Sequence, residues 1–345
     1  MLEGQVSILS SGLLSAEESV ALLQSLRNGP LYCPDRHTYF LYPDRVLPSF
    51  LEKNRFTENQ IPDLRLPEAL TKAQDRTLLI RDMEGAYHFS GNIRNGKDIQ
   101  RALEGLARQP QYAHLVSEEG QMIADLFESI FKHSEFTGRS GTFFAYEGLS
   151  SLYWHMVSKL LLAAQETALK FQNSPMASSL RDKYYDIRAG LGFNKSPADF
   201  GAFPTDPYSH TPKGQGARQP GMTGVVKEEL LARWVEVGLT IKDGCLHFNP
   251  FLVNAKEFIP EGSRFAYMDI HEEQKQIDLP VGSLAFTICQ VPVLVKLADH
   301  DQIVVQFRDG SQESVYANKL DVKRSSHIFN RDGVVNQLTV FLRIL

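Results

Sequence analysis

The spacing of apolar residues changes about two-thirds of the way along this 345-residue chain, and that change limits the possible folds. Before residue 239, apolar residues in the long segments recur every three or four positions, as on one face of an α-helix. After it, short apolar runs alternate with polar turns, which is typical of β-strands, and Asp243-Gly244 between two such runs predicts a hairpin. The pattern predicts a multi-domain α+β protein with a helical domain at 1–258 and an antiparallel β-sandwich domain at 259–345.

Helix boundaries are marked by capping residues in two places. Ser15 with Glu18 is a capping box that begins a helix near the N-terminus. Thr223 occupies the N-cap position of a later helix, and Gly238 stands where its C-terminal cap belongs. Between them, residues 147–171 carry apolar side chains on more than one face, so we expect that helix to be buried on several sides.

Charge and composition exclude several classes of partner. The formal net charge is −5 and no basic run is present, which argues against binding to nucleic acid. The first residues lack the basic and apolar regions of a signal peptide, and the longest apolar stretches are too short to span a membrane. The three cysteines are widely scattered and fit no metal or redox spacing. We therefore expect a cytoplasmic protein with reduced cysteines and no membrane partner.

A glycine-rich stretch, FTGRSGTFFAYEGL, leads directly into the long helix. Arg139, Ser140 and Thr142 within it supply a positive charge and hydroxyls, beside backbone amides that suit an anion or a sugar hydroxyl. Glu147 at the helix start is a candidate catalytic carboxylate, although a carboxylate there also stabilises the helix dipole. Trp154 and His155 follow in the same helix and suit sugar binding, with a core tryptophan and a hydrogen-bonded histidine as the alternative.

Residues 187–222 form a long irregular segment that is rich in glycine and proline but also in aromatic residues. Long loops of this kind inside compact domains are usually functional, and aromatic side chains are not typical of disorder. Aromatic faces combined with many hydrogen-bonding groups fit a carbohydrate cleft. The candidate ligand-binding residues of this segment are Lys195, Asp206 and His210.

The next motif, GMTGVVKEELL, begins the helix that Thr223 caps, and Thr223 is itself a candidate substrate contact. Glu228 and Glu229 are adjacent, so their side chains point in different directions and cannot both face one site. Glu228 is the second candidate catalytic residue. The alternative is a solvated first turn whose carboxylates stabilise the helix dipole.

Two reactions at a glycosidic bond make different demands on these residues. Inverting hydrolysis needs an acid and a base carboxylate about 6.5–9.5 Å apart. Phosphorolysis needs one acid beside a cluster of groups that binds phosphate. The candidate residues include more phosphate-binding groups than spare carboxylates, which favours phosphorolysis with inorganic phosphate as co-substrate. We expect no other cofactor, and no metal-ligand spacing is present.

Three motifs resemble the C-terminal half of bacterial proteins in the six-hairpin glycosidase-like superfamily: GRSGTFFAYEGLSSLYWHMVSKLLLA, NKSPADFGAFPTDPYSHTP and QPGMTGVVKEELLARW. The line DGCLHFNPFLV is similar to the one that leads into the closing β-sandwich of cellobiose and maltose phosphorylases. The resemblance implies a partial (α/α)6 toroid whose active-site cup lies at the N-terminal ends of the inner helices. It also implies that the chain is the C-terminal part of a larger enzyme, with the general acid in the earlier half.

Several functions are compatible with this resemblance. The first is a glycoside phosphorylase or an inverting glycoside hydrolase that acts on a glucan-like oligosaccharide, with the corresponding glycosyltransferase or glycosidase chemistry. The second is a non-catalytic carbohydrate-binding or interaction protein that keeps part of the cup. The third is a subunit that completes its toroid with a separate N-terminal half or as a homo-oligomer.

Overall fold

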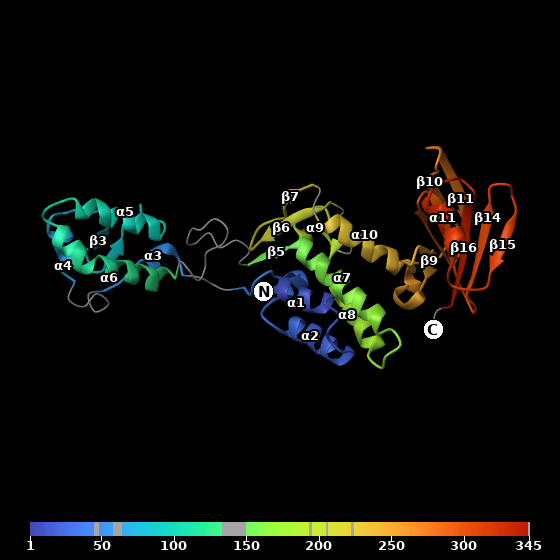
Figure 1. Cartoon of the computed structure of the whole chain (residues 1–345), viewed down its shortest axis with the longest axis horizontal. Coiled ribbons are helices and arrows are strands. Elements are labelled where there is room, and N and C mark those ends of the chain that lie inside the picture. The colour runs from blue at the N-terminus through green and yellow to red at the C-terminus, as the bar shows by residue number, and fades with distance from the viewer. Residues whose placement is uncertain are drawn as a thin grey trace. The chain divides into compact units, whose positions relative to one another are not determined.

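The computed structural model describes residues 1–44, 48–57, 64–132, 150–192, 195–204, 206–221 and 224–343. The chain forms two compact units, which are drawn in Figure 1. The first unit combines Met1–Leu41 with Ser151–Leu345, and the second is Tyr42–Ser150. The predicted boundary at 258–259 falls within the first unit and stays a prediction.

The second unit is an insertion into the first. The backbone N–H of Leu41 donates to the carbonyl of Ser151 at 3.2 Å, so the chain leaves the first unit and returns to it at neighbouring points. The N–H of Leu2 in turn donates to the carbonyl of Leu41 at 2.9 Å. The residues that precede and follow the insertion therefore belong to one continuous structure.

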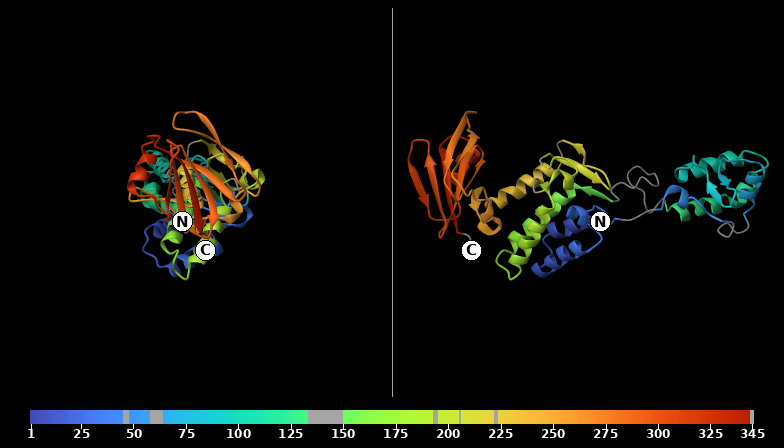
Figure 2. Two further views of the ribbon diagram at one scale, coloured as in Figure 1. Left: turned by 90° about the vertical axis from the view of Figure 1, so that its right-hand side faces the viewer. Right: turned by 180° about the vertical axis from the view of Figure 1, so that it is seen from behind.

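Helix α7 lies at the centre of the helical part of the first unit. It packs against α1, α8 and α10, and Figures 1 and 2 show α7 and α8 beside α1 and α2. Side chains on most faces of α7 are buried against these neighbours, whereas His155, Lys159 and Glu166 lie on a face that is partly exposed. The helices of this part are α1 (Leu2–Ser10), α2 (Ala16–Asn28), α7 (Trp154–Lys170), α8 (Ala177–Ala189), α9 (Pro197–Phe200) and α10 (Gly224–Glu236).

The sequence predicted where two of these helices begin, and the structure tests both predictions. The predicted capping box is confirmed, since Ser15 accepts from the N–H of Glu18 and Glu18 accepts from the N–H of Ser15. The long helix begins at Trp154 and not at residue 147, because β5 (Ser151–Tyr153) pairs with a distant strand directly before it.

Short strands cover the ends of the helices. Strand β5 pairs with β6, and β6 with β7, so part of the predicted loop at 187–222 is an antiparallel sheet. A second small sheet follows α2. The elements are β1 (Tyr32–Cys33), η1 (Pro34–Arg36), β2 (Thr38–Tyr39), β6 (Tyr208–Pro212) and β7 (Arg218–Pro220).

After α10 the chain changes to strands. The predicted hairpin is confirmed: β8 (Leu239–Lys242) and β9 (Cys245–Phe248) pair across Asp243 and Gly244. Both turn residues have positive φ, 52° and 72°, as a two-residue turn that matches the strand twist requires. Two short helical turns, η4 (Pro250–Leu252) and η5 (Ala255–Glu257), lead into the following strands.

The C-terminal part of the chain contains a five-stranded sheet with the order β12-β13-β16-β14-β15. Its pairs are antiparallel except β13 with β16, which run parallel, so the expected purely antiparallel arrangement is wrong at this pair. Helix α11 packs against β9 and β16. The elements are β10 (Ser263–Met268), β11 (Gln274–Leu279), β12 (Ser283–Ile288), β13 (Val291–Ala298), β14 (Gln302–Phe307), β15 (Gln312–Val315), α11 (Val322–Phe329) and β16 (Val335–Arg343).

The inserted unit has its own hydrophobic core, in which Phe56, Phe89, Phe127 and Phe131 are almost fully buried. The centroids of neighbouring rings in this group lie 4.8–6.2 Å apart. Its elements are α3 (Phe50–Lys53), α4 (Arg65–Lys72), β3 (Leu79–Arg81), β4 (Tyr87–Phe89), α5 (Gly96–Ala107) and α6 (Ala113–Phe131).

Mixed helices and mainly antiparallel sheets make this an α+β protein, as the sequence predicts. Over the ranges that the structure describes, no sheet closes into a barrel. No helix within those ranges combines the length and the apolar character that crossing a membrane requires.

Candidate functional site

His155 and Glu228 meet where α7 and α10 begin. His155 lies in the first turn of α7, and its Nε2 is 3.3 Å from Oε1 of Glu228 on α10. An ionised carboxylate can only accept, so this contact requires the proton on Nε2. The histidine side chain is 41% exposed, whereas that of Glu228 is only 3% exposed. The pair therefore connects a buried carboxylate to a ring that solvent and ligands can reach.

The other oxygen of Glu228 is the unusual feature of this pair. Among the described residues, its Oε2 has no hydrogen-bond partner although it is buried. A buried acceptor without a partner costs about 1–3 kcal/mol, more when it is charged, so native proteins rarely contain one without a reason. A ligand hydroxyl or a water that donates to Oε2 would remove that cost.

Gly224 allows the close approach of the two helices at this point. A Cβ atom on Gly224 would lie 2.2 Å from Nε2 of His155, far inside contact distance. The glycine therefore lets the backbone at the start of α10 lie against the imidazole. The motif prediction at 221–231 missed this role, and the only signal for it was a glycine at the first position of a helix.

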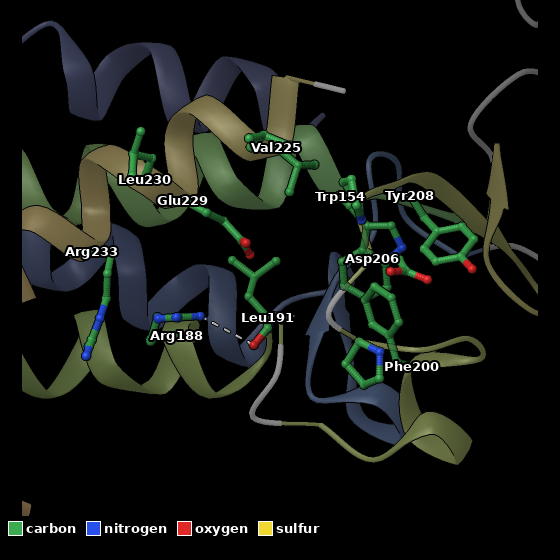
Figure 3. A pocket seen from close by; sticks show the side chains of 14 residues that line it. Trp154, Arg188, Leu191, Phe200, Asp206, Tyr208, Val225, Glu229, Leu230 and Arg233 are labelled. Atoms are coloured by element: carbon green, nitrogen blue, oxygen red, sulfur yellow. Dashed lines mark hydrogen bonds between the residues drawn. The ribbon is translucent and has the colours of Figure 1, made fainter. Parts of the chain in front are cut away.

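A pocket of about 380 Å³ lies between α8, α10 and the loop around residues 200–208 (Figure 3). In Figure 3, Glu229 extends from α10 toward Leu191 and Arg188. Burial raises the pKa of the Glu229 carboxyl above its ordinary value of 4.5. Glu228 and Glu229 thus face different surroundings, as adjacent positions on a helix require, and Glu229 is the one that lines the pocket.

Two arginines on the pocket wall are held by an ion-pair network beneath it. Nε of Arg188 donates to Oε1 of Glu236 at 2.9 Å, and Nη1 of Arg233 donates to Oε2 of the same carboxylate at 3.0 Å. The hydroxyl of Tyr184 donates to Oε1 of Glu236 at 2.6 Å, and Arg233 also pairs with Glu257. Glu236 thereby fixes both guanidinium groups beside the pocket.

Trp154 is predicted as a ligand contact, and the structure shows what holds it. Its side chain is buried, and its Nε1 donates to Oγ1 of Thr211 at 2.9 Å. The centroids of the Trp154 and Phe200 rings lie 4.6 Å apart. The indole thereby ties the beginning of α7 to β6 and forms part of the pocket wall. Asp206, another predicted contact, lines the same pocket.

Lys195 and His210 do not line this pocket. Nζ of Lys195 donates to the carbonyl of Arg36, and burial lowers the pKa of its amine. The Arg36 guanidinium donates to the carbonyls of Asp199, Phe200 and Gln215, which attaches this loop to the first part of the chain. The ring of His210 stacks on that of Tyr153 with 5.6 Å between centroids, across the β5–β6 pair.

Five of the predicted site residues lie outside the described ranges: Arg139, Ser140, Thr142, Glu147 and Thr223. Of the others, the structure pairs His155 with Glu228 and brings Trp154 and Asp206 to one pocket. The two arginines of the pocket were not among the predicted site residues, although Arg188 lies at the beginning of the segment 187–222 and Arg233 near the end of the motif QPGMTGVVKEELLARW.

The fold is thus that of an α+β protein in which a separate α+β unit interrupts the helical part. Residues 47–134 match the family model described as GH149 phosphorylase insertion domain 2. The match falls within the inserted unit and relates the protein to glycoside phosphorylases. No curated protein matches the chain.

Proposed function

We propose that this protein is a glycoside phosphorylase or a part of one, which acts on a glucan-like oligosaccharide with inorganic phosphate as co-substrate. The observation that carries the proposal is the match of the inserted unit to an insertion domain of a phosphorylase family. In this reaction a phosphate oxygen bonds to the anomeric carbon while the glycosidic C–O bond breaks. The leaving oxygen takes a proton from a carboxylic acid, and the products are a sugar 1-phosphate and a shortened oligosaccharide.

The polar groups around the starts of α7 and α10 suit this substrate. Oε2 of Glu228 is a buried acceptor without a partner among the described residues, and a sugar hydroxyl would supply the missing donor. His155 beside it offers an exposed ring, whose other nitrogen can form a second hydrogen bond with the sugar. We assign Glu228 and His155 to substrate contact, and we retain Arg139, Ser140, Thr142 and Thr223 as phosphate or sugar contacts.

The nearby pocket supplies a second group of polar side chains. Glu229 has a raised pKa, so it holds its proton to higher pH than an ordinary glutamate and suits the role of proton donor. Arg188 and Arg233 provide positive charge close to it. The helical part of the first unit is, in this proposal, a partial (α/α)6 toroid, and the C-terminal strands form the β-sandwich that follows it.

The test is to incubate the 345-residue protein with glucose oligosaccharides of several linkages, with and without inorganic phosphate. Phosphate-dependent formation of glucose 1-phosphate would support the proposal. Release of free glucose without phosphate would replace it with a hydrolase. Oligosaccharide binding without either reaction would instead indicate a carbohydrate-binding protein, and addition of a separately produced N-terminal half would then show whether the reaction needs it.

A further inference from the structure

A second polar groove lies in the C-terminal part of the first unit, separate from the residues discussed so far. It has a volume of about 680 Å³, within the range of about 300–1,000 Å³ that ligand pockets occupy. One wall is the β10–β11 hairpin, and the other is formed by the beginnings of β13 and β16 with Arg308 after β14. We call it the hairpin groove.

The hairpin wall presents aromatic and aliphatic surface. Phe265 and Tyr267 alternate along β10, so they share one face, and their rings lie nearly parallel with 6.1 Å between centroids. Their partners on β11 are Ile277 and Lys275, and both line the groove together with Tyr267. This face of the hairpin is only half-buried at the two rings, which leaves flat apolar surface for a ligand.

The opposite wall carries planar polar groups beside the apolar side chains of Val291, Pro292 and Val335. Gln290, Asn336 and Gln337 provide amides, each with donors and an acceptor, and Arg308 provides a guanidinium. Nε2 of Gln290 donates to the carbonyl of Asp269 at 2.8 Å, which holds this wall to the turn of the hairpin. The groove is therefore a connected structure and not a gap between two independent segments.

The charges of the groove balance. Asp269 and Glu273 are acidic, and Lys275 and Arg308 are basic. Oδ1 of Asp269 accepts from the backbone N–H groups of His271 and Glu273 at 2.9 Å, and Lys275 pairs with Glu273. Because acid and base are equal in number and partly paired, the groove favours a neutral polar ligand over an anion or a cation.

We propose that the hairpin groove binds a neutral oligosaccharide, with sugar rings against Tyr267 and hydroxyls bonded to the amides of the opposite wall. Flat aromatic surface combined with amide groups suits pyranose rings, whose faces are apolar and whose edges carry hydroxyls. The choice of a carbohydrate among neutral polar ligands rests on the proposed function. The site itself rests on the groove, and it is distinct from the pocket beside α10 in all its lining residues.

The test is isothermal titration calorimetry on the 345-residue protein with linear glucose hexasaccharides of α-1,4, β-1,4 and β-1,3 linkage. We expect one of them to bind with a Kd between about 10 μM and 1 mM. Tyr267→Ala and Asn336→Ala should each raise that Kd at least about tenfold. Tyr316→Ala is the matched control, because Tyr316 is a 79% exposed tyrosine that does not line the groove. Asn336 is exposed, so its variant tests the proposal even where Tyr267→Ala does not fold.

Failure of this proposal can be told apart from failure of the proposed function. Unchanged affinity in both groove variants, or no binding of any hexasaccharide, would overturn the groove even in a protein that forms glucose 1-phosphate. Conversely, binding that Tyr267→Ala and Asn336→Ala weaken would support the groove even in a protein without phosphorolysis. A Glu228→Gln variant should bind the hexasaccharide with the same Kd as the wild type. Loss of binding in this variant would show that the hexasaccharide binds at the other site, and would overturn the proposal.

Discussion

Glu119 in the inserted unit and Glu228 in the first unit are buried to the same extent, with 3% of each residue exposed. Oε1 of Glu119 accepts from N and Nε of Arg65 at 3.0 and 3.3 Å, and its Oε2 accepts from the N–H of Leu66 at 2.7 Å. Oε1 of Glu228 contacts His155, and its Oε2 has no partner among the described residues. Burial alone therefore does not distinguish the two carboxylates, whereas the use of their oxygens does.

The difference indicates what each carboxylate is for. Glu119 satisfies backbone N–H groups at the beginning of α4, which have no partner within that helix. It connects α6 to α4 and leaves no oxygen for a ligand. Glu228 contributes less to the stability of the fold than its burial suggests, because the cost of the unsatisfied oxygen offsets the stabilisation from its contact with His155. The comparison predicts that Glu119 affects the stability of the protein and that Glu228 affects the binding of substrate.

The largest effect that we expect is on activity, in Glu228→Gln. The variant replaces a carboxylate oxygen with an amide, so the proposed acceptor for a sugar hydroxyl is weakened or lost. We expect kcat/KM for phosphorolysis to fall by about 100-fold or more, with an unfolding midpoint no lower than that of the wild type. Steady-state kinetics and thermal unfolding measure the two quantities.

The control for this variant is Glu17→Gln, which changes an exposed glutamate on α2 in the same way. If Glu228→Gln had wild-type kinetics and a lower thermal unfolding midpoint, the prediction would be wrong. Glu228 would then be a structural residue like Glu119.

Stability is the expected readout for Glu119→Ala. The substitution leaves the N–H groups of Arg65 and Leu66 without their acceptor at a helix start, one of them in a buried position. We expect a loss of about 2 kcal/mol in the free energy of unfolding, typical of a lost cap together with an unsatisfied donor. Urea denaturation measures it, with Glu104→Ala, an exposed position on α5, as the control. Equal stabilities of the two variants would show that the cap is not needed.

Local signals predicted several elements correctly. The Ser15–Glu18 capping box and the Asp243-Gly244 hairpin each depend on residues within a few positions of one another, so the sequence contains all the information they need. The change of apolar spacing likewise reflects which neighbours each residue meets on a helix or a strand. The α+β class follows from such patterns.

Features that depend on distant residues were not predictable in the same way. The long helix begins at Trp154 because Ser151–Tyr153 pair with Tyr208–Pro212, a partner far along the chain. Nothing in the spacing near Leu41 marks the insertion, since the bond to Ser151 forms only in the fold. The pocket arginines belong to two helices and are set in place by a shared glutamate.

Gly224→Ala tests whether the close approach of Gly224 to the imidazole of His155 positions the His155–Glu228 pair. A Cβ atom there would overlap the imidazole, so either the ring or the start of α10 must move. We expect kcat/KM to fall by about tenfold, because the pair is misaligned while its groups are still present. Gly105→Ala, at a helical glycine with open space around its Cβ position, is the control. A Gly224→Ala enzyme with wild-type kinetics would show that the close approach does not position the pair.

The smallest effect on stability that we expect concerns Glu229, which is half-buried and lines the pocket beside α10. Burial raises its pKa in the folded protein above the ordinary value of 4.5, so the folded state binds more protons than the unfolded state between the two pKa values. The contribution of this group to stability is therefore full below pH 4.5 and is lost as the pH rises through the folded pKa. Glu229→Gln removes the titration, so wild type and variant should differ in stability by an amount that changes between acid and neutral pH. Thermal unfolding of both proteins over that range measures the change, and parallel curves would show that Glu229 is ionised in the folded state like an exposed glutamate.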